Sequence, residues 1–238
     1  MMNPCARLSH GCGFLLLLVS VAGHAASPAP PPTWTSSFVT RVEALAILQS
    51  LNAELLSHDS ATLTLEHWCD VHRLASPAKI TAARVMDVDK QPTAEQRVEL
   101  GVSPTESVHY RRVKLACGAV VLSEADNWYV PGRLTPEMNK QLDGSDTPFG
   151  VVVRPLHFQR HTVSSRLLWL PLPAGWEMRG GAVAGGAVTG GAEVAGDQPM
   201  PPRLLEHRAI LSLPDGTPFS EVVETYTDQV LGFAVPTP

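Results

Sequence analysis

The sequence predicts an α+β domain built on a mainly antiparallel sheet, with helices packed on one side of it. Three observations support this class. The composition of the 238 residues, 44% hydrophobic and 17% charged, is typical of a globular chain with one or at most two domains. Helix-period segments are frequent before residue 100, and hairpin-like strand pairs dominate the second half. Strands joined by tight turns favour antiparallel pairing over a parallel sheet with crossover helices.

Residues 1–25 have the three parts of a secretory signal. Arg7 supplies a short basic region, Phe14–Ala22 is an apolar run of nine residues, and Gly23-His24-Ala25 offers small residues for cleavage. The run is too short for a spanning helix. We therefore expect a secreted or periplasmic protein with no stable membrane span after cleavage; an over-extended gene start or a retained anchor is the alternative. A stiff, proline-rich leader, residues 26–39, follows.

Helical periodicity opens the domain. Leucines recur every three or four residues from Leu45 to Leu55, which predicts an amphipathic helix. A second helix follows, with Thr62 as its candidate cap, and Thr93 and Gln96 have the spacing of a capping box at the start of a third. The expected helices cover residues 40–58, 62–74, 93–100, 135–142 and 146–153.

Two hairpins are the centre of the predicted sheet. The first covers residues 108–131 around a turn at Cys117-Gly118, and the second covers residues 203–233 around Pro214-Asp215-Gly216. We expect these two hairpins to lie side by side. Two further strands are expected at residues 80–88 and 157–170.

The segment 180–202 is rich in glycine and alanine and nearly uncharged. Such a composition buries too little apolar surface to offset the entropy of ordering, so we expect a disordered insertion. A proline cluster follows it where a phosphate-binding loop would need a helix. The remainder, residues 40–238, is predicted to be a single domain that contains this insertion.

Charge and cysteine content restrict the classes of partner and site. The net charge of −5 argues against nucleic acid, because neutralising phosphates requires clustered Lys and Arg. No group of His and Cys has the spacing of metal ligands, so no metal site is expected. Once the signal is cleaved, Cys69 and Cys117 are the remaining cysteines. They are either a disulfide or two buried free thiols; the spacing does not decide, and we prefer free thiols.

Strand alternation sorts the polar residues of the hairpins onto two faces. Arg112 falls on a polar face that could line a pocket, whereas Arg111 falls on the face expected to contact the helices. Glu224 lies on the last strand. An arginine and a glutamate in one enclosed pocket would suit an anionic substrate, because arginine binds carboxylates in a bidentate manner and a buried glutamate exchanges protons near neutrality. The alternative is an ordinary ion pair between Arg112 and Glu224 on a solvated face.

Four motifs in order carry a family resemblance. They are an arginine five residues before a cysteine in Arg112–Cys117, a strand ending in Val-Pro at Asp126–Pro131, the short Thr147–Gly150, and Asp215–Pro218 leading to Glu224-Thr225-Tyr226. Together they resemble the chorismate pyruvate-lyase family, whose fold is shared with effector-binding domains of bacterial repressors. The resemblance implies a chorismate lyase-like fold over roughly residues 40–232, and no cofactor.

The resemblance also implies roles for individual residues. Arg112 would bind the substrate carboxylate, and Glu224 would assist proton transfer as the enolpyruvyl group leaves; Glu221 is the rival for that role. Asp126, Asn127 and Phe149 match positions at the ligand. This chain departs from the family pattern at two of them. In the family, glycine occupies the position that matches Asp126, and arginine occupies the position that matches Asn127.

The implied function is elimination of pyruvate from chorismate or a related enolpyruvyl acid, giving an aromatic acid such as 4-hydroxybenzoate. The alternative is a non-catalytic exported module that binds a small aromatic or carboxylate ligand. A third interpretation is an envelope interaction protein that uses the proline-rich leader and the segment 180–202. In the first two cases the partner is a small-molecule carboxylate, and we expect a monomer.

Overall fold

The computed structural model describes residues 33–178, 199–233 and 235. The signal expected at 1–25, the first part of the leader and most of the glycine-rich segment lie outside the described residues. None of the helices within the described ranges is long and apolar enough to cross a membrane.

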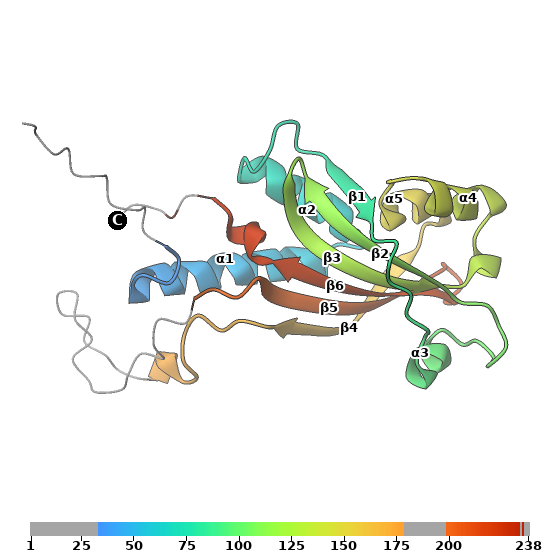
Figure 1. Ribbon diagram of the computed structural model, residues 1–238. Helices are drawn as coiled ribbons and strands as arrows, with labels where there is room; N and C mark the ends of the chain where they lie inside the picture. Colours follow the sequence, from blue (N-terminus) through green and yellow to red (C-terminus); the bar gives the residue numbers. More distant parts are fainter. Residues whose placement is uncertain (1–32, 179–198, 234, 236–238) are drawn as a thin grey trace, which may run out of the picture. The chain divides into compact units, whose positions relative to one another are not determined.

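A six-stranded sheet forms the centre of the described chain, and every neighbouring pair of strands is antiparallel (Figure 1). Its order is β1-β2-β3-β6-β5-β4. The strands are β1 (Ile80–Arg84), β2 (His109–Cys117), β3 (Val120–Tyr129), β4 (Gln159–Leu167), β5 (Arg203–Ser212) and β6 (Pro218–Thr227). The predicted α+β class with a mainly antiparallel sheet is therefore confirmed.

The two predicted hairpins are β2–β3 and β5–β6, and they are neighbours in the sheet. Strands β3 and β6 pair directly, with Ala125 opposite Glu224. Each hairpin turns at a glycine in the left-handed region, Gly118 with φ +58° and Gly216 with φ +87°. A side chain at Gly118 would be doubly unfavourable, because an added Cβ would lie 2.9 Å from the Cβ of Ala75.

Within the described ranges five α-helices accompany the sheet: α1 (Phe38–Ser57), α2 (Ala61–Val71), α3 (Ala94–Glu99), α4 (Pro136–Gly144) and α5 (Phe149–Val153). The capping box of Thr93 and Gln96 is confirmed at the start of α3. Thr62 does not cap α2. The Ser60 hydroxyl accepts a hydrogen bond from the backbone N–H of Leu63 at 3.3 Å, so the cap lies two residues earlier than predicted.

Four helices cover one face of the sheet, and the fifth lies on the other. Buried side chains of α1 and α2 pack against one part of the first face, and those of α4 and α5 pack against another. Helix α3 ends at Leu100, which packs against Trp128 and Val130 on the opposite face. Figure 1 shows α3 apart from the other four helices. The prediction of helices on one side is thus correct for all but α3. We call the face under α1 and α2 the covered face and the other the charged face.

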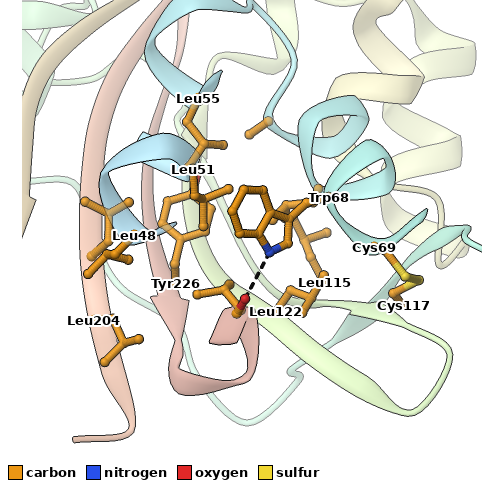
Figure 2. Packing of buried hydrophobic residues seen from close by; sticks show 14 of the residues in the cluster. Leu48, Leu51, Leu55, Trp68, Cys69, Leu115, Cys117, Leu122, Leu204 and Tyr226 are labelled. Atoms are coloured by element: carbon orange, nitrogen blue, oxygen red, sulfur yellow. Dashed lines mark hydrogen bonds between the residues drawn. A yellow bond between two sulfur atoms is a disulfide. The ribbon is translucent and has the colours of Figure 1, made fainter. Parts of the chain in front are cut away.

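The main core lies between α1, α2 and the covered face (Figure 2). Leu48 and Leu51 of α1 are fully buried there, close to Tyr226 of β6. Trp68 of α2 adds a directional contact, because its Nε1 donates to the backbone carbonyl of Val230 at 3.0 Å. The Nε1 of Trp34 donates in the same way to the carbonyl of Leu231 at 2.8 Å. Buried indoles require such acceptors.

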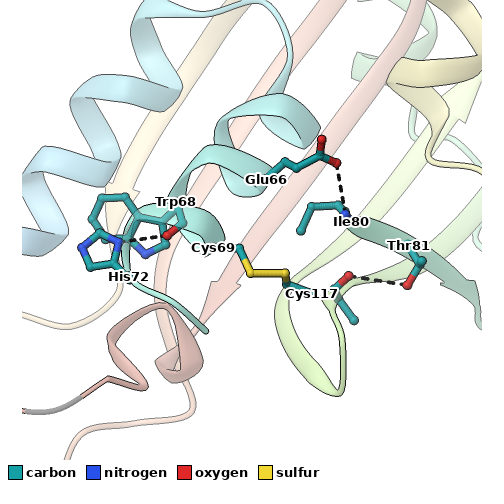
Figure 3. Close-up of a disulfide and its surroundings, with 8 residues drawn as sticks. Glu66, Trp68, Cys69, His72, Ile80, Thr81 and Cys117 are labelled. Atoms are coloured by element: carbon teal, nitrogen blue, oxygen red, sulfur yellow. Dashed lines mark hydrogen bonds between the residues drawn. A yellow bond between two sulfur atoms is a disulfide. The ribbon is translucent and has the colours of Figure 1, made fainter. Parts of the chain in front are cut away.

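Cys69 and Cys117 form a disulfide, with their Cα atoms 6.5 Å apart (Figure 3). The preferred interpretation, two buried free thiols, is wrong. Burial of both cysteines does not distinguish the two alternatives. The position of the C-terminal part of α2 over the end of β2 does, because it brings the two sulfur atoms together. Glu66 of α2 adds a second link between helix and sheet by accepting from the backbone N–H of Ile80 at 3.2 Å.

Candidate functional site

A small cavity lies between the covered face of the sheet and the starts of α2 and α5. It measures about 40 Å³ as the space open to the centre of a water molecule. One wall is apolar and includes Phe149, Phe158 and Val222. The polar lining consists of Asp59, Ser60, Thr62, Arg111, Asn127, Arg160 and Glu224. A few polar and charged side chains beside an apolar wall are the usual composition of a small-molecule pocket.

Arg111, and not Arg112, is the arginine of β2 that lines this cavity. Successive side chains of a strand point to opposite faces, so only one of the two can share the cavity with Glu224. The burial pattern of β2 alternates in the predicted manner, with Val113 and Leu115 in the core on the side of Arg111. The expectation that Arg112 and Glu224 meet in one pocket is therefore wrong. The sequence predicts that Arg111 lies on the face that contacts the helices; that face also holds the cavity.

Arg112 and Asp126 lie together on the charged face. The guanidinium of Arg112 contacts Glu124 at 3.1 Å and Asp126 at 3.8 Å. Asp126 also accepts hydrogen bonds from Lys90, at 2.5 Å, and from the hydroxyl of Tyr110. Burial, and then the carboxylate of Asp126, raise the pKa of Tyr110. Asp126 does not reach the cavity. It stands opposite Arg112 in the β2–β3 register, so both side chains lie on the charged face.

Asn127 and Phe149, two of the predicted ligand-binding residues, line the cavity. Asn127 stands opposite Arg111 in the β2–β3 register, so the two side chains are neighbours on the covered face. The hydroxyl of Ser220 donates to Oδ1 of Asn127 at 2.6 Å. Phe149 begins α5 and packs against Tyr129, with ring centroids 5.5 Å apart. The first residue of this short helix therefore forms part of the apolar wall.

Glu224 is held in the cavity by two donors. Nη2 of Arg160 lies 2.6 Å from Oε2, and the hydroxyl of Tyr226 donates to the same oxygen at 3.2 Å. Only 4% of the Arg160 side chain and 8% of the Glu224 side chain are exposed, which makes this a buried ion pair. The second oxygen, Oε1, accepts no hydrogen bond from the described residues. Sequence reasoning missed Arg160, since nothing in a β-rich edge strand marks one arginine as functional.

Arg111 has a different environment. It is 4% exposed, and its Nη2 donates to the backbone carbonyls of Ser145, at 3.3 Å, and Thr147, at 3.1 Å. No carboxylate of the described residues forms an ion pair with it, and its Nε has no hydrogen-bond partner there. Burial, and then repulsion from Arg84, lower the pKa of Arg111 to about 10. A buried cation without an anion is costly unless another charge can compensate it.

Glu221, the rival of Glu224, lies on the charged face beneath α3. It is fully buried and accepts hydrogen bonds from Nε of Arg208, at 2.7 Å, and Nε2 of Gln96, at 3.1 Å. It does not line the cavity. Of the two glutamates, the structure brings only Glu224 together with Arg111.

His207 of β5 lies behind Glu224, its partner in the β5–β6 register. The imidazole is fully buried, and its Nε2 is 2.7 Å from Oδ1 of Asn52 in α1. Burial lowers the pKa of His207 to about 4, against the opposing effect of Glu224. The ring is therefore neutral at physiological pH, so Arg111 and Arg160 are the cationic side chains of the cavity lining.

No model of a known protein family matches the chain. It is 52% identical over 206 residues to the uncharacterized protein y4mC of Sinorhizobium fredii (strain NBRC 101917 / NGR234), and the match covers 85% of this chain and 83% of that protein. The chain belongs to the same family as y4mC.

Among solved structures, the chain is similar to PhnF from Mycobacterium smegmatis, with a TM-score of 0.46 and 13% identity over 77% of this chain and 70% of that one. The effector domain of the same protein gives a TM-score of 0.44 and 13% identity, over 72% and 90% of the two chains. The ligand-binding domain of a putative GntR-family transcriptional regulator from Bordetella bronchiseptica gives 0.38 and 15%, over 62% and 82%. The α+β architecture is established by the sheet and the helices described above.

Proposed function

We propose that this member of the y4mC family binds a small carboxylic acid in the cavity, with the acid group on Arg111. The observation that carries the proposal is a buried guanidinium, 4% exposed, that lines a cavity and has no carboxylate partner among the described residues. A ligand carboxylate supplies the missing charge. Arginine offers it a planar fork of donors, so the bound acid would be both neutralised and oriented.

The rest of the lining defines the other end of such a ligand. Oε1 of Glu224 accepts nothing from the described residues, so it is available to a hydroxyl or amine group. Phe149 and Phe158 provide an apolar wall against which a flat hydrocarbon fits. A hydroxylated acid matches both features.

The cavity volume restricts which acids fit without rearrangement. At about 40 Å³ the described space holds a group the size of a few water molecules. Pockets for drug-sized ligands measure about 300 Å³ or more. Acetate and pyruvate therefore suit the cavity as it stands, and a benzoate-sized acid requires the walls made by α2 and α5 to separate.

The test compares two adjacent arginines. Binding of acetate, pyruvate, benzoate and 4-hydroxybenzoate to the purified, oxidised protein is measured by calorimetry and thermal shift. Arg111→Met should weaken binding of the preferred acid by about tenfold to a hundredfold, because a charged hydrogen bond is lost. Arg112→Met, on the same strand but the opposite face, is the matched control and should bind as wild type. Equal affinities in the wild type and the Arg111 variant would refute the proposal.

A second candidate is a lyase of the chorismate pyruvate-lyase type. The observation that favours it is a glutamate with one unoccupied oxygen in the same cavity as an arginine from the β2–β3 hairpin. In this reaction Arg111 would hold the substrate carboxylate. Glu224 would take the ring proton as the bond between the ring carbon and the enolpyruvyl oxygen breaks. It would then return the proton to the departing enolpyruvate, so that pyruvate and 4-hydroxybenzoate are released.

Turnover decides between binding and catalysis. The protein is incubated with chorismate, and release of pyruvate and 4-hydroxybenzoate is followed. The lyase predicts turnover that Glu224→Gln reduces by at least about a hundredfold, while Glu124→Gln on the charged face leaves it unchanged. Ligand binding without turnover leaves the first proposal standing and rejects the lyase.

We further propose that the protein is exported. The sequence at 1–25 has the parts of a secretory signal, and the disulfide of Cys69 and Cys117 suits an oxidising compartment. Fractionation of cells in which free thiols are trapped at lysis tests this. We expect the protein outside the cytoplasm with both cysteines oxidised; a cytoplasmic protein with two free thiols would contradict it.

A further inference from the structure

The cavity contains one polar contact that the proposed binding of acids does not explain. Ser220 lies outside the cavity and is fully buried, yet its hydroxyl donates to the side-chain oxygen of Asn127, which lines the cavity. An asparagine amide has one acceptor end and one donor end. Because Oδ1 is held by Ser220, Nδ2 is the end that is left for the cavity, and it donates to no described residue.

This orientation opposes what Arg111 alone would select. Arg111 stands directly opposite Asn127 in the register of β2 and β3, and a guanidinium attracts an oxygen more strongly than an NH₂ group. Without Ser220, a half-turn of the amide would bring Oδ1 toward Arg111. The two side chains would then bind each other, and Arg111 would no longer need a ligand anion.

We propose that Ser220 is a positioning residue that keeps the Asn127 amide turned so that Arg111 and Asn127 together present only donors to the ligand. This inference rests on the proposed function, because it deepens the same acid site. When only donors face the ligand, both oxygens of a carboxylate can accept hydrogen bonds from them. It rejects the isosteric carboxamide, whose NH₂ group would face another donor and leave both unsatisfied. The site therefore selects carboxylates over amides, and Ser220 controls that choice from outside the cavity.

Acetate and acetamide are the probes for this test, because they have nearly the same shape and suit the volume of the cavity. Wild type should bind acetate more tightly than acetamide by at least about tenfold. Ser220→Ala should reduce this ratio by about tenfold, through weaker acetate binding. Ser220→Thr keeps the hydroxyl and should restore the ratio. Ser123→Ala removes another fully buried serine, on β3 and outside the cavity lining, and should leave the ratio unchanged.

A second pair of variants applies if Ser220→Ala does not fold. Ser220→Val and Ser220→Thr have the same shape and differ in the hydroxyl, so a lower acetate-to-acetamide ratio in the valine variant supports the inference. Equal ratios in these two variants, with acetate binding still dependent on Arg111, overturn the role of Ser220 and leave the acid site intact. Acetate binding that does not depend on Arg111 instead refutes the proposed function itself.

Discussion

Arg111 and Arg112 are adjacent in the chain, and their surroundings differ in almost every respect. Arg112 is shared between Glu124 and Asp126, with side chains 19–23% exposed, and water screens these pairs. Arg111 is 4% exposed and has only two backbone carbonyls as hydrogen-bond acceptors among the described residues. On the charged face Arg112 is paired with carboxylates of the protein, whereas on the covered face Arg111 has no carboxylate partner among the described residues. Counting charged residues in a strand therefore says little about function until the face of each is known.

The largest expected difference between the two faces concerns their ion pairs. Arg160→Met leaves Glu224 buried without its cation and should lower the free energy of unfolding by about 3–5 kcal/mol. Arg112→Met removes a partly exposed cation and should cost no more than about 1 kcal/mol. Urea unfolding of both variants measures the contrast. Similar losses of unfolding free energy in the two variants would contradict the expectation that the buried ion pair matters more than the partly exposed one.

The disulfide should have the next largest effect. It closes a loop with a sequence separation of 48 residues, for which the chain-entropy model gives about 4 kcal/mol, although measured values are often smaller. It joins α2, whose start lines the cavity, to β2, which carries Arg111. Replacing both cysteines by alanine should therefore weaken acid binding as well as stability. A double variant with unchanged urea midpoint and unchanged affinity would show that the link is dispensable to the covered face.

A smaller and pH-dependent effect is expected from His207. Its pKa is about 4 in the folded protein and close to 6.5 when unfolded, so the unfolded chain binds more protons between these values. The stabilisation is complete above about pH 6.5 and is lost as the pH falls toward 4, amounting to at most about 3 kcal/mol. His207→Gln should flatten the pH dependence of the urea midpoint in this window. His161→Gln, an exposed histidine, should not alter it.

Local patterns predicted most of the architecture. The turn glycines and the alternating strands specified both hairpins, and the capping box at Thr93 identified the start of α3. The neighbouring positions of the hairpins, an expectation based on their polar faces, are confirmed by the β3–β6 pairing. These features depend on residues close in sequence or on period-two alternation, so they were accessible without coordinates.

The structure brings only part of the predicted site together. Glu224, Asn127 and Phe149 line one cavity, and Arg112 and Asp126 do not. The error was to assume that the more polar face of β2 lines the pocket. Which face encloses a cavity depends on how α2 and α5 cover the sheet, and that is a property of long-range packing. Arg160 was missed for the same reason, since only the sheet order brings β4 within reach of β6 through the intervening β5.

The two indole contacts at Val230 and Leu231 link the last described turn to tryptophans far away in the sequence. A polypeptide that stops before Val230 loses the acceptors of both Trp34 and Trp68. Two buried N–H groups would then be left without partners in the core beneath α1 and α2. Prematurely terminated chains should consequently have altered tryptophan fluorescence and be readily degraded, so folding itself discriminates against incomplete translation products.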